Sequence, residues 1–368
     1  MKINEVIEYL NHKTLPCYQE DYDNAGFILG DTDQDLQGIL ITLDVTPEVV
    51  QEAIEGHFNL IVSHHPLIFG GLKRITTGSP TGRMVMQLIE HHVAVYAAHT
   101  NLDNLEWGVN GILAEKLGLT DCAILRPIEG VLRKMVTYVP TSHADKVRQV
   151  LFDCGAGCIG AYDSCSYNSE GVGTFRPMEG THPYCGTVGS LHREAESRIE
   201  VIYEKRLEGR LVRRLREVHP YEEPAIDCIA LANTYSKMGA GMMGRLSTSL
   251  TAAELLARVK QTLNLPVVRC SASAKQLEET LVRSVALCGG SGSFLIADAK
   301  RAGADIFLTA DLKYHDFQMA DSGIILADIG HYESEQFAKE IFYRLLSEKF
   351  STFACQISKC GTGFVHYI

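Results

Sequence analysis

Short, nearly continuous apolar runs recur near both ends of the chain, and they constrain its fold more than any other feature. Each of the six runs is dominated by aliphatic residues: 38–45, 59–65, 92–99, 281–288, 304–310 and 323–329. Strands without polar alternation are expected where both faces of a sheet are covered. Helical patterns such as Pro47–Gly56 and Gly82–His92 separate the first runs. The two ends therefore predict related α/β halves of one core.

The middle of the chain has a different composition. From about 130 to 232 it is richer in Cys, Tyr, Gly and charged residues, and it contains strand-like pieces at 134–140 and 198–203, each followed by a helical pattern. We interpret this stretch as an inserted α+β domain, with 232–245 as a glycine-rich return linker. The predicted domains are residues 1–128, 129–232 and 233–368, the first and last together forming the α/β core.

Charge and apolar patterning exclude several partners. The net charge is −11 and the pI is near 5.7, so neither nucleic acid nor an anionic membrane is expected as a partner. The N-terminal segment reads as an amphipathic helix, and no run approaches the roughly 20 apolar residues of a membrane span. We expect a cytoplasmic protein. Its eleven cysteines lack a CxxC pair, and the spacing of Cys154, Cys158 and Cys165 is not that of a standard zinc knuckle.

Polar, metal-ligating residues gather where buried strands end. The segment Ser-His-His-Pro (63–66) places His64 and His65 at the end of one apolar run, the usual location of a site in an open α/β sheet. Adjacent residues of a regular strand point to opposite faces, so one histidine per metal ion is the simpler arrangement. A capped or core histidine pair is the alternative.

The segment His-Thr-Asn-Leu-Asp (99–103) follows a second buried run. A carboxylate directly beyond an apolar strand needs a partner, and Asp103 could bridge two cations. Taken alone, Asp103 could equally be a helix N-cap. His99 is less convincing as a ligand, and a role in orienting a ligand is at least as plausible.

The segment Asp-Ile-Gly-His-Tyr-Glu-Ser-Glu (328–335) follows a third apolar run and opens a helix. His331 and Glu335 are four residues apart, so a helix places both on one face. Such a pair alone is usually a solvated surface. Three His/carboxylate segments at three strand ends, however, are hard to obtain from packing alone, and together they predict a metal centre.

These segments, with Asp-Tyr-Asp-Asn-Ala-Gly (21–26) and Thr-Ala-Asp-Leu-Lys-Tyr-His-Asp (309–316), resemble the Nif-three-like dinuclear metal-centre family over the whole chain. Members of that family are often labelled GTP cyclohydrolase 1 type 2 homologues. The resemblance implies two divalent metal ions per chain held by five residues: His64, His65, Asp103, His331 and Glu335.

The resemblance also implies a homo-oligomer, a toroidal hexamer whose metal sites face the interior cavity. In longer members a ferredoxin-like domain similar to PII/CutA proteins is inserted between the halves, and residues 155–189 and His-Pro-Tyr-Glu-Glu-Pro (219–224) look like that insert. Two positions depart from the family pattern: Ala310 stands where glycine is common, and Gly111 where a polar residue often follows Asn110. Neither is a proposed ligand.

Imidazole and carboxylate without thiolate suit zinc, our first expectation, and also iron, manganese, cobalt or nickel. Lys313 and His315 could contact substrate, or could equally cap a helix or pair with nearby aspartates. Cys-Gly-Gly-Ser-Gly-Ser-Phe (288–294) could cradle an anion through its amides, or could be a tight turn that needs glycines. The sequence assigns neither a catalytic residue nor an organic cofactor.

Two functions remain open at this point. The first is a metal-dependent hydrolase of a small molecule or nucleotide, with the cyclohydrolase label coming from the family alone. The second is a non-catalytic metal-binding or regulatory hexameric assembly, in which the insert senses a ligand or docks a partner.

Overall fold

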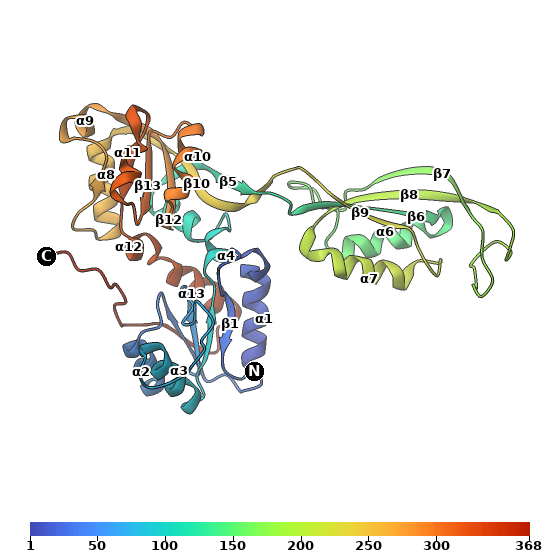
Figure 1. The fold of residues 1–368 in the computed structure, drawn as a ribbon, viewed down its shortest axis with the longest axis horizontal. Helices are drawn as coiled ribbons and strands as arrows, with labels where there is room; N and C mark the ends of the chain where they lie inside the picture. The colour runs from blue at the N-terminus through green and yellow to red at the C-terminus, as the bar shows by residue number, and fades with distance from the viewer. The chain divides into compact units, whose positions relative to one another are not determined.

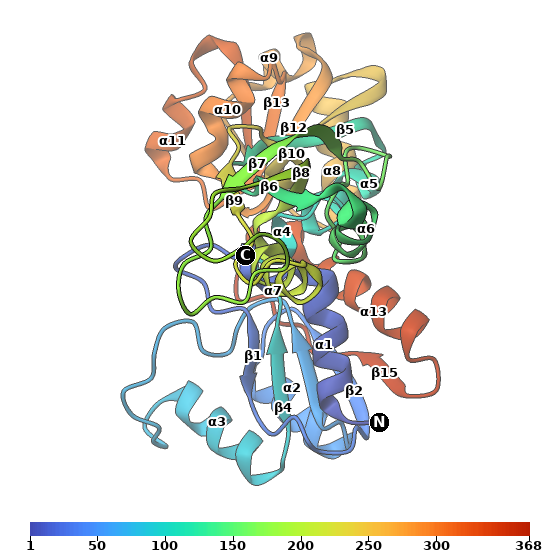
Figure 2. The same cartoon turned by 90° about the vertical axis from the view of Figure 1, so that its right-hand side faces the viewer.

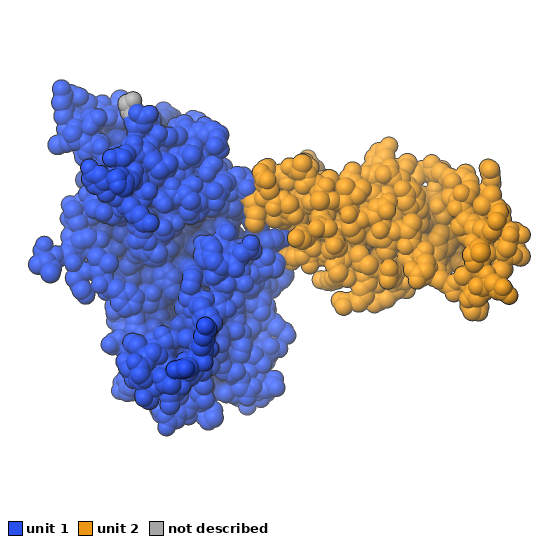
Figure 3. All heavy atoms as spheres, in the orientation of Figure 1, with its two compact units in different colours: residues 1–127, 236–368 blue, residues 128–235 orange. Residues whose placement is uncertain are grey.

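The computed structural model describes residues 1–321 and 323–368. The chain forms two compact units, drawn in different colours in Figure 3. Unit 1 combines Met1–Pro127 with Ser236–Ile368. Unit 2 is Ile128–Tyr235, whereas the sequence predicted an insert with the bounds 129–232. Across the described residues, no helix is both long enough and apolar enough to cross a membrane.

The first sheet of unit 1 has five strands in the order β1-β4-β3-β2-β15. Its strands are β1 (Gly26–Leu29), β2 (Gly38–Thr42), β3 (Leu60–Ser63), β4 (Ala94–Ala97) and β15 (Ala354–Ile357). Strands β2, β3 and β4 are parallel and entirely buried, as their apolar runs predicted. The accompanying helices are α1 (Ile3–Thr14), α2 (Pro47–Glu55) and α3 (Pro80–Glu90). Val49 and Leu88 of these helices pack with Leu40 and Ile61 of the sheet.

The second sheet of unit 1 has six strands in the order β11-β14-β13-β12-β10-β5. Its strands are β5 (Leu119–Ile128), β10 (Tyr235–Thr251), β11 (Arg269–Cys270), β12 (Leu281–Ser291), β13 (Ile306–Ala310) and β14 (Ile325–Asp328). The longer helices are α5 (Val109–Leu117), α8 (Ala252–Leu263) and α13 (Ala338–Lys349). The shorter ones are α4 (Thr100–Asp103), α9 (Ala274–Glu279), α10 (Ile296–Arg301), α11 (Tyr314–Gln318) and α12 (His331–Glu335). Figures 1 and 2 show both sheets of unit 1 with their helices.

Each sheet contains a strand from the other half of the chain. Strand β15, close to the C-terminus, pairs in parallel with β2 of the N-terminal half, and β5 of the N-terminal half lies beside β10 in the second sheet. The halves at 1–128 and 233–368 are therefore interlocked by strand exchange.

The predicted return linker at 232–245 is wrong for most of its length, because Tyr235–Thr251 is one long strand. Its glycines serve close packing against β5: a Cβ at Gly239 would lie 2.1 Å from the Arg126 carbonyl oxygen. Glycine in a strand can mark such an approach between backbones as readily as a turn.

Unit 2 has the element order β-α-β-β-α-β of the ferredoxin-like fold. Its elements are β6 (Leu132–Pro140), α6 (Ala144–Asp153), β7 (Tyr167–Phe175), β8 (His192–Glu204), α7 (Glu208–Val218) and β9 (Ile226–Ala230). The antiparallel sheet has the order β7-β8-β6-β9. Both helices pack on one of its faces (Figure 1), where Val147 and Leu211 contact Ile199 and Val201.

Candidate metal centre

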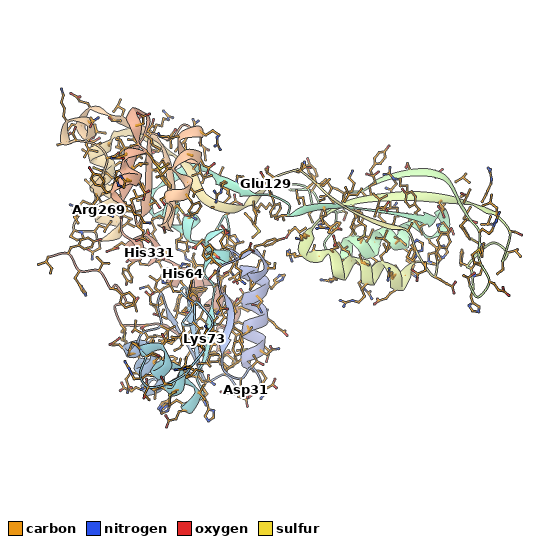
Figure 4. All side chains as sticks on the ribbon, viewed as in Figure 1. Asp31, His64, Lys73, Glu129, Arg269 and His331 are labelled. Carbon is orange, nitrogen blue, oxygen red and sulfur yellow. The ribbon has the colours of Figure 1, made fainter. Side chains whose placement is uncertain are left out.

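Three chain segments converge on one point of unit 1. Strand β3 ends at Ser63, so His64 and His65 lie just beyond the regular strand and their rings are only 4.9 Å apart, centroid to centroid. Helix α12 begins at His331, whose ring centroid lies 5.4 Å from that of His65. Figure 4 shows His64 and His331 close together within unit 1. The rule that adjacent strand residues diverge does not apply here, because the backbone has already left the strand.

Glu335 is the central residue of this cluster. Its Oε2 lies 3.0 Å from His65 Nε2, 3.1 Å from His331 Nε2 and 3.8 Å from His64 Nε2. Asp103 Oδ1 lies 3.5 Å from His64 Nε2. The donor atoms form two groups that share Glu335, one with His65 and His331 and the other with His64 and Asp103. This arrangement fits one strand-end histidine per ion, with Glu335 as the shared ligand.

Two buried atoms of the cluster have no hydrogen-bond partner among the described residues. They are His64 Nε2 and Asp103 Oδ1, which face each other. Leaving a buried donor or acceptor unsatisfied costs about 1–3 kcal/mol, and native proteins rarely tolerate it. A cation between an imidazole nitrogen and a carboxylate oxygen would satisfy both. The residues present therefore fit a divalent metal ion.

The far nitrogen of each histidine is held by an oxygen. His65 Nδ1 lies 2.7 Å from Asp44 Oδ1, and His331 Nδ1 lies 2.7 Å from Asp311 Oδ2. His64 Nδ1 lies 2.9 Å from the Ala98 carbonyl oxygen. Such partners fix the ring and leave Nε2 free to face a metal.

His99 follows the same pattern with a carboxylate that the sequence reasoning missed. Its Nδ1 lies 2.8 Å from Asp23 Oδ1, and its ring lies within ligand distance of His64 and His65. Asp44 and Asp311 were also missed as histidine partners, although both follow apolar strand runs, which is the signal that singled out Asp103.

The electrostatics of the site reflect these contacts. Burial alone would lower the pKa of His65 and His331, but hydrogen bonds to Asp44, Asp311 and Glu335 outweigh it and raise these values to about 10 and about 11. Burial lowers the pKa of His64. Burial and the nearby charge of Glu335 raise the pKa of Asp103 well above its usual value. Metal ligands bind in their deprotonated forms, so a cation would compete with protons at this site.

The glycine segment at 288–291 leaves room for the Glu335 side chain. The amides of Gly289 and Gly290 donate to Asn110 Oδ1 and Ser334 Oγ, so these two do not cradle an anion. Gly290 has φ +63, and a Cβ there would lie 2.1 Å from Glu335 Oε1. These contacts agree with the alternative that this is a tight turn that needs its glycines.

Other candidate residues lie outside the cluster. The Lys313 amide donates to Asp316 Oδ2 at the start of α11, and His315 Nδ1 lies 3.4 Å from Gln318 Oε1. The Lys313 backbone thus takes part in a helix cap, which was the alternative to a contact with substrate. Cys154, Cys158 and Cys165 do not form a metal-ligand group among the described residues.

Small-ligand sites are typically cavities of roughly 300–1,000 Å³, and one of about 460 Å³ opens beside the cluster. Its walls include Asp103, His331 and Glu335, together with Arg126 and Phe294. The Arg126 guanidinium lies over the Phe294 ring, 4.7 Å from its centroid. Arg126, whose Nη1 also lies 3.8 Å from Asp298 Oδ2, gives the wall of the cavity a positive group that suits an anionic ligand.

The fold and the site define a class of protein: an α/β core, interlocked by strand exchange, with a His/carboxylate cluster able to hold metal between its halves. A profile described as Duf34/NIF3 (NGG1p interacting factor 3) matches residues 1–362. The chain belongs to this family, as the resemblance predicted.

The relatives match this chain along most of its length. A Bacillus subtilis protein named GTP cyclohydrolase 1 type 2 homolog is 38% identical over 347 residues, covering 93% of this chain and 91% of that protein. One of the same name from Halalkalibacterium halodurans is 40% identical over 332 residues, covering 89% and 88%. The crystal structure of a Bacillus cereus protein related to NIF3 superposes with a TM-score of 0.85 at 35% identity, covering 100% of this chain and 99% of that one.

Proposed function

We propose that this protein binds two divalent metal ions through His64, His65, Asp103, His331 and Glu335, and that it hydrolyses an anionic small molecule in the adjoining cavity. The observation that carries the proposal is the buried, unpartnered pair of His64 Nε2 and Asp103 Oδ1, whose carboxylate residue also lines the 460 Å³ cavity. Zinc is the first candidate, since the ligands are imidazoles and carboxylates.

Two such ions, when bound, supply Lewis acidity and a nucleophile derived from water at neutral pH. The residues of the chain supply orientation. Asp44 and Asp311 hold the rings of His65 and His331, and Arg126 offers a charge-assisted contact to an anionic group of the substrate. The name of the relatives makes GTP the first compound to test, followed by other nucleotides and phosphoesters.

The first experiment is metal content per chain by elemental mass spectrometry. Wild type is compared with the His331→Ala/Glu335→Ala double variant after matched purification, with Asp33→Ala as an exposed acidic control outside the cluster. The expected result is near two metals per chain in wild type and in the control, and a sharp fall in the double variant. A folded wild type that binds no metal would reduce these residues to a structural hydrogen-bond network.

The second experiment is turnover of the compound panel after reconstitution with zinc, manganese or iron. Activity should disappear in Asp103→Ala and persist in Asp33→Ala, and activity unchanged by Asp103→Ala would refute the hydrolytic proposal. Metal binding without turnover of any compound would favour the non-catalytic, regulatory alternative.

We also propose, from the family resemblance, that unit 2 is a PII/CutA-like domain and that six chains form a ring. The β-α-β-β-α-β order of unit 2 supports the first part. Native mass spectrometry of the full chain tests the second part, with a hexamer expected and a stable monomer contradicting it.

A further inference from the structure

A second cluster of metal-ligating side chains lies in unit 2, separate from the residues of the proposed centre. It consists of Cys185, near the end of the 176–191 segment that joins β7 to β8, and of His192 and Glu194 at the start of β8. One donor atom from each of the three side chains falls within 4.8 Å of the other two. His192 Nε2 lies 2.8 Å from Glu194 Oε2.

We propose that Cys185, His192 and Glu194 form a binding site for one thiophilic divalent cation of the Zn²⁺ type. Cysteine sulfur, imidazole nitrogen and carboxylate oxygen are all established zinc ligands. The addition of a thiolate separates this donor set from the imidazole and carboxylate set of unit 1, so the two sites should differ in metal preference.

The register of the sheet explains how the ligands meet. His192 and Glu194 are two apart on β8 and share one face of the sheet, opposite to the face that carries Ile199 and Val201 toward the helices. Gly173 pairs directly with Glu194, and the Glu196 carboxylate lies where a side chain at Gly173 would be, with Oε2 2.0 Å from an added Cβ.

The backbone directly after Cys185 lies close to the His192 side chain. Gly186 has φ +86, and a Cβ there would lie 3.0 Å from His192 Cγ. Glycine at this position therefore lets the segment lie against β8 with the Cys185 side chain beside its two partners.

The three proposed ligands already interact with one another. Burial and the Glu194 carboxylate raise the pKa of the Cys185 thiol, and a hydrogen bond to His192 lowers the pKa of Glu194. A cation would displace the thiol proton and take the place of the hydrogen bond between imidazole and carboxylate. It would thereby tie the 176–191 segment to the sheet.

Three protein ligands leave one position of a tetrahedral ion open. A cavity of about 440 Å³ lies close by, and its walls include Tyr184, the chain neighbour of Cys185, together with Phe175, Glu196 and Tyr221. Phe175 also contacts the His192 ring, with centroids 5.2 Å apart. None of the three proposed ligands lines this cavity, so the proposal concerns the cation alone, with its fourth position left to water.

Cobalt(II) titration of the full-length protein tests the site, because thiolate ligation gives a sulfur-to-cobalt charge-transfer band that imidazole and carboxylate ligands do not give. We expect the band in wild type, its loss in Cys185→Ser, and its retention in Cys158→Ser, a matched change of an exposed thiol in the same unit. Zn²⁺ should bleach the band by displacing cobalt.

The band should also persist in the His331→Ala/Glu335→Ala variant, so failure of the proposed centre in unit 1 would not be mistaken for failure here. Glu194→Gln, which preserves side-chain size, should weaken cobalt binding, while circular dichroism verifies that each variant is folded. Absence of the band in wild type, or an undiminished band in folded Cys185→Ser, would overturn the proposal.

Discussion

Replacing Gly290 by alanine should damage the metal centre without touching a ligand. Gly290 has φ +63, and an added Cβ would lie 2.1 Å from Glu335 Oε1 and 3.4 Å from His331 Cε1. Real Cβ atoms do not approach this closely, so either the Glu335 carboxylate or the β12 backbone must move. The proposed shared ligand would then be displaced from both groups of donors.

The magnitude follows from two contributions. Forcing alanine into the left-handed region costs roughly 1–2 kcal/mol. Pulling Glu335 away from His65 and His331 breaks a buried charge network, which costs about 3–5 kcal/mol. The metal-free Gly290→Ala protein should therefore lose roughly 4–7 kcal/mol in its free energy of unfolding.

Gly303 provides a matched control. It also has a left-handed φ, +75, but nothing lies within 4 Å of its added Cβ. Gly303→Ala should cost only the backbone contribution of roughly 1–2 kcal/mol and should keep its metal. Urea unfolding followed by circular dichroism measures the stabilities, and elemental mass spectrometry measures the metal content. Equal losses in the two variants, with equal metal content, would refute the reasoning.

Two further predictions concern carboxylates that hold neighbouring groups in place. Asp44→Asn and Asp311→Asn should each weaken metal binding about 10–100-fold, since the carboxylates orient His65 and His331; competition with a chelator measures this, and unchanged affinity would contradict the orienting role. Glu52 accepts hydrogen bonds from Ser358 and from the Lys359 amide just after β15. Burial opposes the effect, but these bonds lower the pKa of Glu52 below its ordinary 4.5. Its stabilisation is thus present above pH 4.5 and lost as the pH falls. Glu52→Gln should cost about 1 kcal/mol at neutral pH, and urea unfolding should show the difference from wild type vanish in acid.

The sequence predicts the central strands well and the exchanged strands badly, for physical reasons. Strands β2, β3 and β4 are buried on both faces, so their apolar runs are unambiguous. Strand β10 contains Gly239 and Gly241, which read as a linker because a linear pattern does not reveal that β5 packs against them. The pairing of β15 with β2 spans nearly the whole chain, and no local pattern encodes it.

The same limit applies to the candidate site. Strand ends single out His64 and Asp103, because the parallel neighbours β3 and β4 of the first sheet end at the same edge. His331 follows β14 of the second sheet, so only the tertiary structure brings it to them. Asp23 precedes its strand instead, so only the fold brings it to His99. The left-handed Asp311, with φ +58, also depends on tertiary context, since such a conformation is costly without support from its surroundings.

The division of the proposed ligands between the halves would couple metal binding to their association. His64, His65 and Asp103 come from the N-terminal half, whereas His331 and Glu335 come from the C-terminal half, and Glu335 belongs to both groups of donors. An ion held by both halves stabilises only the associated state, by RT ln(1 + [L]/Kd), which reaches about 4 kcal/mol at a thousandfold excess over Kd. Strand exchange through β15 and β5 joins the same halves independently of the proposed ligands. The exchanged strands would thus offset part of the cost of burying the unpartnered pair of His64 Nε2 and Asp103 Oδ1, and a cation would satisfy both atoms.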